Sequence, residues 1–472
     1  MEMNGPRIRA GCAAEMPRSR SCRTDTGAPT SPMQSIAPTL DHRTADDSAA
    51  LRVLCVGVGV LLAILPLAHV TALRNVMIGV IAVSALLQFR LVPWRNVPGF
   101  VPWLFWLSFA AASIAWSALP HVSFQSFRTD QFYPFVLFLV SFVLMRFRGG
   151  RLAVVSGSAA GTLLCLATIF ASSVSGYDSK SDEPAAGPLG WLAWKAGEPT
   201  DSSTYVAFIA VPLFLVLTTS RRRWRRWAAG IWLAVFAAIG FMSESRTLFV
   251  SLSVSFAGFL IVLGLMRGRL HVKSALFILL LGIVVSAISL EVISRARLPA
   301  PPPADRSAAV QMIMSDPRPA IWAVYAELVG RHPWLGVGLG RSVPSRAYNL
   351  GDSPELREID AHATTHAHNV LLDLLLQVGI IGVALWIGLH VAILRLAVKR
   401  ARNGGDREKA WAAAAVALVL AMLIKNSTND LIVFGNALLF WSLLGTMLGL
   451  IWRQGDAPGD TVLLQAPGAE KK

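Results

Sequence analysis

The chain has 472 residues, of which 54% are hydrophobic and 15% are charged, and its mean hydropathy is +0.54. A water-soluble protein carries about a quarter charged residues, so this composition excludes an ordinary soluble enzyme. The net charge is +15, but lysines and arginines cluster in short connections between apolar blocks. This distribution argues against nucleic acid as a partner and favours the lipids of a membrane.

The first 50 residues are polar and rich in Arg, Ser, Pro and Thr, and they contain no apolar run. A signal peptide needs such a run, so residues 1–50 are predicted to form a disordered, basic cytoplasmic tail. Residues 453–472 are predicted to form a second, short cytoplasmic tail. Between the two tails, residues 51–452 are expected to form one polytopic membrane domain.

Long apolar segments follow one another from residue 51 onward. A stretch of ~20 apolar residues spans the ~30 Å hydrocarbon core of a bilayer. Segments of this kind are predicted near residues 52–72, 75–91, 98–117, 131–146, 151–172, 203–220, 227–243, 247–265, 274–291, 368–394, 410–424 and 431–451. The expected fold is therefore an all-α bundle of about twelve transmembrane helices.

The basic connections set the expected orientation, because cytoplasmic loops are enriched in lysine and arginine. Alternating the sides places four of them on the cytoplasmic face, namely MRFRGGR, SRRRWRRW, MRGRLHVK and VKRARNGGDREK. Two sizeable segments are then expected on the outer side, residues 173–202 and residues 292–367. A loop as long as the second tends to be functional. Helical spacing of the apolar residues at 319–330 predicts that this loop carries short helices.

Two arginines on the expected outer side are candidate anion ligands. Arg246, in the stretch SESRT, follows the seventh apolar segment, where the positive-inside rule disfavours a cation. Its side chain either reaches the lipid headgroups or binds a phosphate group, with Glu244 as a local partner. Arg318 lies between Pro317 and Pro319, which fix its backbone.

The glycine-rich stretch HPWLGVGLGRS, residues 332–342, allows two interpretations. Gly336 and Gly338 either permit a tight loop that returns to the membrane or form a backbone nest for phosphate oxygens. A dinucleotide fingerprint is excluded, since that motif needs a preceding strand. Arg341 closes the stretch and is also expected on the outer side.

Three histidines, His362, His366 and His368, lie within seven positions of one another. The neighbouring carboxylates do not complete a known metal-ligand pattern, so no metal is expected, and a neutral imidazole can serve as a general base. In a regular helix, His366 would share a face with Asn369 and Asp373. A carboxylate at this depth is costly in lipid, so Asp373 is expected to face the protein interior.

Three of these stretches, in the same order, resemble the O-antigen ligase family. They are SESRT, then RPAIW with HPWLGVGLG, then HAHNVLLDLLLQVGIIG. The late segment NSTNDLIVFGNALLFWSLLG is similar to the last helices of that family. The resemblance covers about residues 51–452, and the family also includes Wzy-type polysaccharide polymerases and O-linked protein oligosaccharyltransferases.

The resemblance implies transfer of a glycan from an undecaprenyl diphosphate carrier at the periplasmic face of the bacterial inner membrane, without a cofactor. Arg246 and Arg318 match the family arginines that would bind the diphosphate, with Trp322 completing the R-x-x-x-W stretch. His368 matches the family's catalytic histidine, and His366 ranks second. The residues expected to support them are Asn369, Asp373, Glu244, Gly336, Gly338 and Arg341.

The acceptor is left open by the resemblance. Lipid A core as the acceptor would make the protein an O-antigen ligase, which is the favoured interpretation. A second repeat unit would make it a polymerase of O-antigen or exopolysaccharide, and a protein serine would make it an oligosaccharyltransferase. A transporter without a catalytic step is the fourth alternative, but transporters place polar groups near the bilayer midplane. Here the polar residues gather at one edge.

Overall fold

The computed structural model describes residues 48–88, 97–175, 187–196, 199–242, 245–297, 307–314, 316–359, 364–428 and 434–452. The expected tails fall outside these residues, apart from residues 48–50 of the first. Those three residues belong to the start of the first described helix, where the Ser48 hydroxyl accepts a hydrogen bond from the Leu51 amide at 3.2 Å.

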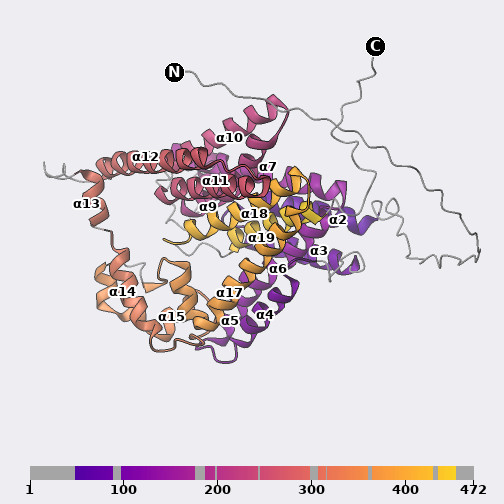
Figure 1. Ribbon diagram of the computed structural model, residues 1–472. Coiled ribbons are helices and arrows are strands. Elements are labelled where there is room, and N and C mark those ends of the chain that lie inside the picture. Colours follow the sequence, from indigo (N-terminus) through magenta and orange to yellow (C-terminus); the bar gives the residue numbers. More distant parts are fainter. Residues whose placement is uncertain are drawn as a thin grey trace, which may run out of the picture. The chain divides into compact units, whose positions relative to one another are not determined.

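Every regular element among the described residues is a helix, so the all-α prediction is confirmed there (Figure 1). The membrane part begins with α2 (Ala49–Ile64), α3 (Thr71–Leu87), α4 (Phe100–Ala112), α5 (Pro120–Ser126), the π-helix η3 (Phe127–Phe132), α6 (Tyr133–Leu144) and α7 (Arg148–Ser175). It continues with α8 (Gly187–Trp194), α9 (Pro199–Thr219), α10 (Arg223–Met242), α11 (Arg246–Arg267) and α12 (Val272–Arg297).

The segment after α12 contains α13 (Ala308–Met314), α14 (Arg318–Val329), α15 (Ser342–Ala347), the short 3-10 helix η4 (Leu350–Asp352) and α16 (Pro354–Ile359). The expectation of short helices within residues 292–367 is therefore confirmed. Three long helices complete the chain, α17 (Val370–Arg402), α18 (Asp406–Lys425) and α19 (Phe434–Trp452).

A helix lies at each of the predicted apolar segments, but the number of membrane spans is a separate question. Seven described stretches are long and apolar enough to cross a bilayer. They are Pro120–Leu144, Arg148–Ser175, Asp201–Thr219, Thr247–Arg267, Val272–Val292, Val370–Arg402 and Phe434–Trp452. Three other helices are apolar but shorter, and α18 carries charged residues at both ends. The count of about twelve spans is not confirmed.

Glycines allow several helix pairs to approach closely, as they do in other membrane bundles. A Cβ atom on Gly157 of α7 would lie 2.4 Å from the backbone oxygen of Gly59 in α2. A Cβ atom on Gly445 of α19 would lie 2.3 Å from the backbone oxygen of Phe138 in α6. These contacts fix the pairs α2–α7 and α6–α19, and α11 packs along α18 in the same core.

A second, smaller hydrophobic cluster lies outside the main core and joins the short helices to the start of α17. It consists of Ile321, Tyr325 and Leu328 of α14, Leu350, Leu356, Ala367 and Leu376. Because Ala367 separates His366 from His368, this cluster holds the histidine segment against α14. Apolar burial thus gives the segment between α12 and α17 a fixed structure of its own.

Helix α17 is interrupted at Gly379, where φ is +64° and ψ is −173°. The interruption frees backbone groups that the loop 333–338 then satisfies. The amide of Val337 donates to the Leu376 oxygen at 2.9 Å, and the amide of Ile380 donates to the Pro333 oxygen at 2.8 Å. A break within an apolar helix of this length needs such partners, because unpaired backbone groups are costly in lipid.

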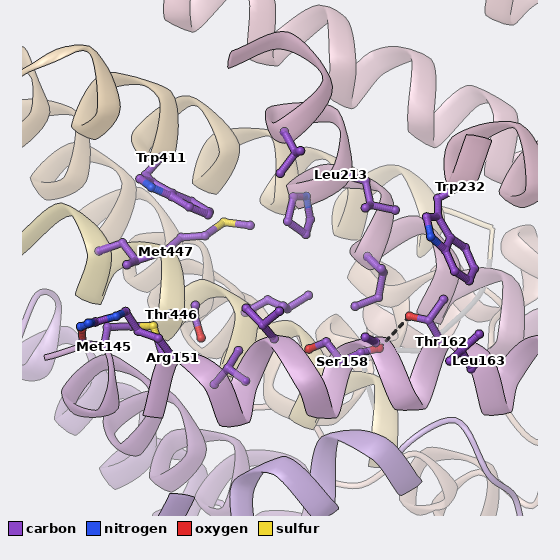
Figure 2. Close-up of a pocket in the computed structure, with 18 residues that line it drawn as sticks. Met145, Arg151, Ser158, Thr162, Leu163, Leu213, Trp232, Trp411, Thr446 and Met447 are labelled. Carbon is purple, nitrogen blue, oxygen red and sulfur yellow. Dashed lines mark hydrogen bonds between the residues drawn. The ribbon is translucent and has the colours of Figure 1, made fainter. Parts of the chain in front are cut away.

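An apolar cavity of about 440 Å³ lies among α7, α9, α10, α18 and α19 (Figure 2). Its walls include Leu213, Trp232, Trp411 and Met447, and the hydroxyls of Ser158, Thr162 and Thr446 are among its few polar groups. Arg151 lies at one side and donates to the backbone oxygens of Met145 at 3.1 Å and Arg146 at 3.4 Å. The cavity includes none of the candidate site residues.

Candidate active site

The segment that holds the histidines ends at an N-cap. Asn369 has extended backbone angles, and its Oδ1 atom accepts hydrogen bonds from the amides of Leu371 at 3.0 Å and Leu372 at 3.2 Å. Regular helix therefore begins at Val370, and both histidines precede it. Since neither histidine is helical, the expectation that His366 shares a helical face with Asn369 and Asp373 is wrong.

The two histidine rings lie side by side, with their centroids 4.0 Å apart. His366 is buried, and its Nε2 atom lies 2.6 Å from Nη2 of Arg341. A guanidinium only donates, so Nε2 accepts this hydrogen bond. The neutral ring then carries its proton on Nδ1, which lies 2.8 Å from the Thr365 hydroxyl. The basic nitrogen of His366 is thus occupied by Arg341.

Asp373 orders the backbone between the histidines. Its side chain is 2% exposed, and its Oδ1 atom accepts a hydrogen bond from the Ala367 amide at 2.8 Å. The expectation that Asp373 faces the protein interior is therefore confirmed. Tyr325 of α14 is nearby: burial raises the pKa of its hydroxyl, and the Asp373 carboxylate raises it further. His368 itself has a φ of +53°, a strained conformation that the surrounding contacts must hold.

Arg318 is the first residue of α14, with Pro317 at the N-cap and Pro319 in the first turn. Its amide donates to Oδ1 of Asp316 at 3.0 Å, and its Nη1 atom lies 3.2 Å from Oδ2 of the same carboxylate. The guanidinium remains about one third exposed (36%). Asp316 therefore orients Arg318 while leaving part of its surface accessible to a ligand.

The structure adds a cation that the motifs do not include. Lys425, the last residue of α18, is fully buried, and its Nζ atom donates to the hydroxyls of Ser245 at 2.6 Å and Thr247 at 3.1 Å. These two residues flank Arg246. The positive charges of Lys425 and Arg318 also lie close enough to repel each other. A lysine that ends an apolar helix was the available signal, because ionisable residues at membrane depth tend to be functional.

The residues after Lys425 contact the histidine segment directly. The amide of Val370 donates to the Asn426 oxygen at 3.0 Å, and the Nδ2 group of Asn369 donates to the Ser427 oxygen at 3.0 Å. The end of α18 thus joins two parts of the chain: the start of α11 and the start of α17. This arrangement brings the segment around Arg246 towards the histidines.

The predicted diphosphate-binding pair is only partly described. Arg246 is the first residue of α11, and Glu244 lies outside the described residues. Arg318 begins α14, which packs against α17, and its positive charge acts on the ammonium of Lys425. His362 also lies outside the described residues. Within the described part of the chain, no group of three His, Cys, Asp or Glu side chains could hold a metal ion.

Every backbone amide from residue 336 to residue 340 in the glycine stretch donates a hydrogen bond within the chain. The acceptors are the oxygens of His332, Leu376 and Gln377, the Ser113 hydroxyl and the Gln377 side chain. Gly338 has a φ of +112°, and a Cβ atom there would lie 2.3 Å from Oγ of Ser117. A Cβ atom on Gly336 would lie 2.4 Å from the backbone carbonyl carbon of Gln377. This bonding favours the tight loop over the phosphate nest.

Comparison with known proteins identifies the region that holds these residues. Residues 232–387 match the model of the O-antigen ligase family. The chain matches no curated protein. The matched region includes Arg246, Arg318, Arg341, His366 and His368, and it ends within α17, so Lys425 lies beyond it. Members of this family are glycosyltransferase-like membrane enzymes, in keeping with the apolar helices of this integral membrane protein. Over residues 232–387, about a third of the chain, the protein is similar to the O-antigen ligase family.

Proposed function

We propose that the protein is an O-antigen ligase that transfers a glycan from undecaprenyl diphosphate to the lipid A core. The active site would face the periplasm, in the bacterial inner membrane, and the reaction would use no metal. The family match supports the reaction class. The observation that carries the residue assignment is the 2.6 Å contact between Arg341 and Nε2 of His366. It engages Nε2 of His366, and the resemblance to the family assigns the base to His368, whose ring lies 4.0 Å away.

In the proposed reaction, a hydroxyl oxygen of the acceptor attacks the anomeric carbon of the donor glycan. A new carbon–oxygen bond forms while the bond from that carbon to the diphosphate oxygen breaks, and its electron pair leaves with the diphosphate. His368 accepts the hydroxyl proton. One displacement of this kind inverts the configuration of the anomeric carbon.

The departing diphosphate gains negative charge, so fixed cations stabilise the transition state most strongly where water is scarce. Arg246 and Arg318 are the proposed diphosphate ligands. Lys425 extends this set, because its buried ammonium bonds the residues on both sides of Arg246. Arg341 and Asp373 act as positioning residues: one contacts the His366 ring and the other holds the intervening amide.

The surface glycolipids of a deletion strain test this proposal. Loss of the protein should give lipid A core without long chains, together with accumulation of the lipid-linked polymer. Core capped by a single repeat unit would instead identify a polymerase, the family's alternative activity. Unchanged surface glycolipids with loss of a glycosylated protein would identify an oligosaccharyltransferase. Glycan movement across vesicles without any new glycosidic bond would identify a transporter.

A further inference from the structure

A second pocket, of about 260 Å³, lies beside the candidate site and combines polar and aromatic side chains. It is formed where α2 ends and where α3, α9 and α19 begin. The side chains that matter here are Arg74, Asp201, Asn436, His69 and Phe434. Unlike the cavity in Figure 2, its wall carries a charged pair and an amide.

The polar side chains of this pocket are held in place by the protein. Nδ2 of Asn436 donates to Oδ1 of Asp201 at 3.1 Å, and Nη2 of Arg74 donates to the Leu67 oxygen at 2.8 Å. The Asp201 carboxylate also attracts the Arg74 guanidinium. The Nε atom of Arg74 is buried and bonds to no atom among the described residues, so one donor of this side chain lacks a protein acceptor.

Aromatic groups form the rim. Phe434 is 58% exposed and has a φ of +48°, which holds its ring at the start of α19. His69 stacks on Trp194, with centroids 4.3 Å apart and planes 11° apart. Lys195 fixes this stack, because its ammonium lies 4.0 Å from the Trp194 ring centroid and donates to the His69 oxygen at 3.1 Å.

This chemistry suits a sugar ring better than a diphosphate. The charges of Arg74 and Asp201 offset each other, so the pocket has no excess of positive charge for an anion. Carboxylate, amide and guanidinium groups together can donate to and accept from several hydroxyls. An exposed aromatic ring can cover the apolar face of a pyranose. The volume lies below the roughly 300 Å³ at which drug-sized pockets begin, so it would take one ring rather than a chain.

Two observations relate the pocket to the proposed chemistry. Asp201 interacts electrostatically with Lys425, which bonds the residues that flank Arg246. The Phe434 amide lies 3.4 Å from Oδ1 of Asp130, and Asp130 lines a small space together with Arg341. A sugar held against Phe434 would therefore belong to a glycan that reaches the candidate site.

We propose that this pocket binds a single sugar ring of a substrate glycan. The identity of the glycan as a substrate rests on the proposed function, whereas binding of the ring does not. Full-length protein in lipid nanodiscs would be examined by saturation-transfer NMR with methyl glycosides of glucose, galactose, rhamnose and N-acetylglucosamine. We expect saturation of the ring protons of at least one of them.

Variants separate this pocket from other contacts. Phe434→Ala removes an exposed ring, and Arg74→Gln removes the buried donor; each should weaken binding about tenfold. Arg295→Gln, an exposed residue paired with Glu291, is the matched control and should bind normally. His368→Ala should also bind the glycoside. The proposal fails if no glycoside is saturated, or if Phe434→Ala and Arg74→Gln bind as well as the control.

Transfer kinetics then identify which substrate supplies the ring. A raised KM for the acceptor in Phe434→Ala, with an unchanged KM for the donor, assigns the ring to the acceptor. The reverse pattern assigns it to the lipid-linked donor. Glycoside binding by a protein without transfer activity would refute the proposed function and leave the pocket assignment intact. Transfer activity with both KM values unchanged in Phe434→Ala would refute the pocket assignment and leave the proposed function intact.

Discussion

The apolar cavity and the polar pocket share two helices, α9 and α19, yet their linings have opposite character. α9 contributes Asp201 to the polar pocket and Ile209 to the apolar cavity, eight residues or about 12 Å further along. α19 contributes Asn436 to the polar pocket and Leu443 to the cavity, a separation of about 10 Å. Each helix therefore changes from polar to apolar lining within about two turns.

This difference supports the proposed location of the chemistry. The histidines, Lys425 and the Asp201–Arg74 pair all belong to the polar end of the bundle, and the cavity at Arg151 contains none of them. Arg151 also lies in a connection that the positive-inside rule assigns to the cytoplasm. Substitutions at the polar end should impair transfer, whereas substitutions in the apolar cavity should leave it unchanged.

The largest effect is expected at His368. Removal of a general base lowers rates by about 10²–10⁴-fold, so His368→Ala should lose transfer to that extent. His366→Ala should lose less of the transfer rate, because His366 is expected to position its neighbours and not to accept the proton. Initial rates of glycan transfer with both purified variants would measure this. A greater loss in His366→Ala than in His368→Ala would reverse the assignment of the base.

The next effect is expected at Lys425. Lys425→Met keeps an unbranched side chain but removes the ammonium that bonds Ser245 and Thr247. Loss of hydrogen bonds to a charged group costs about 1.5–3 kcal/mol, so transfer should fall by about tenfold to a hundredfold. Lys409→Met, at the other end of α18, is the matched control and should keep wild-type activity. Equal activities in the two variants would remove Lys425 from the site.

A smaller effect, on stability, is expected at the glycine loop. Gly338→Ala forces a Cβ atom against Ser117 at a φ of +112°, a strain of about 1–3 kcal/mol. Gly351→Ala is the matched control, because a Cβ atom there would meet no atom within 4 Å. Thermal unfolding in detergent should show a lower Tm for the first variant alone. Equal Tm values would show that the loop relaxes around the new side chain.

The smallest effect is expected in the apolar cavity. Thr446 is buried there, and its hydroxyl bonds to no partner among the described residues. Thr446→Val replaces this hydroxyl with a methyl group, which should change stability by less than about 1 kcal/mol and leave transfer unchanged. A marked loss of transfer in Thr446→Val would break the distinction between the two ends of the bundle.

The sequence predicted those features that depend on local pattern. Apolar runs located the helices, the spacing at 319–330 located α14, and the cost of a buried carboxylate placed Asp373 inside. Contacts between distant residues were not predictable in this way. Nothing local pairs Arg341 with His366, or Lys425 with Ser245, 180 residues away. The helical face proposed for His366 was wrong because an N-cap at Asn369 starts the helix later.

The interruption of α17 makes the direction of the helix that follows the histidines depend on residues 333–338. Gly379 separates residues 370–378 from the rest of α17. The backbone of the loop 333–338 forms hydrogen bonds with residues on both sides of this interruption. Trp334, within that loop, is 64% exposed. These bonds couple the loop that carries Trp334 to the start of α17, which follows the histidine segment directly.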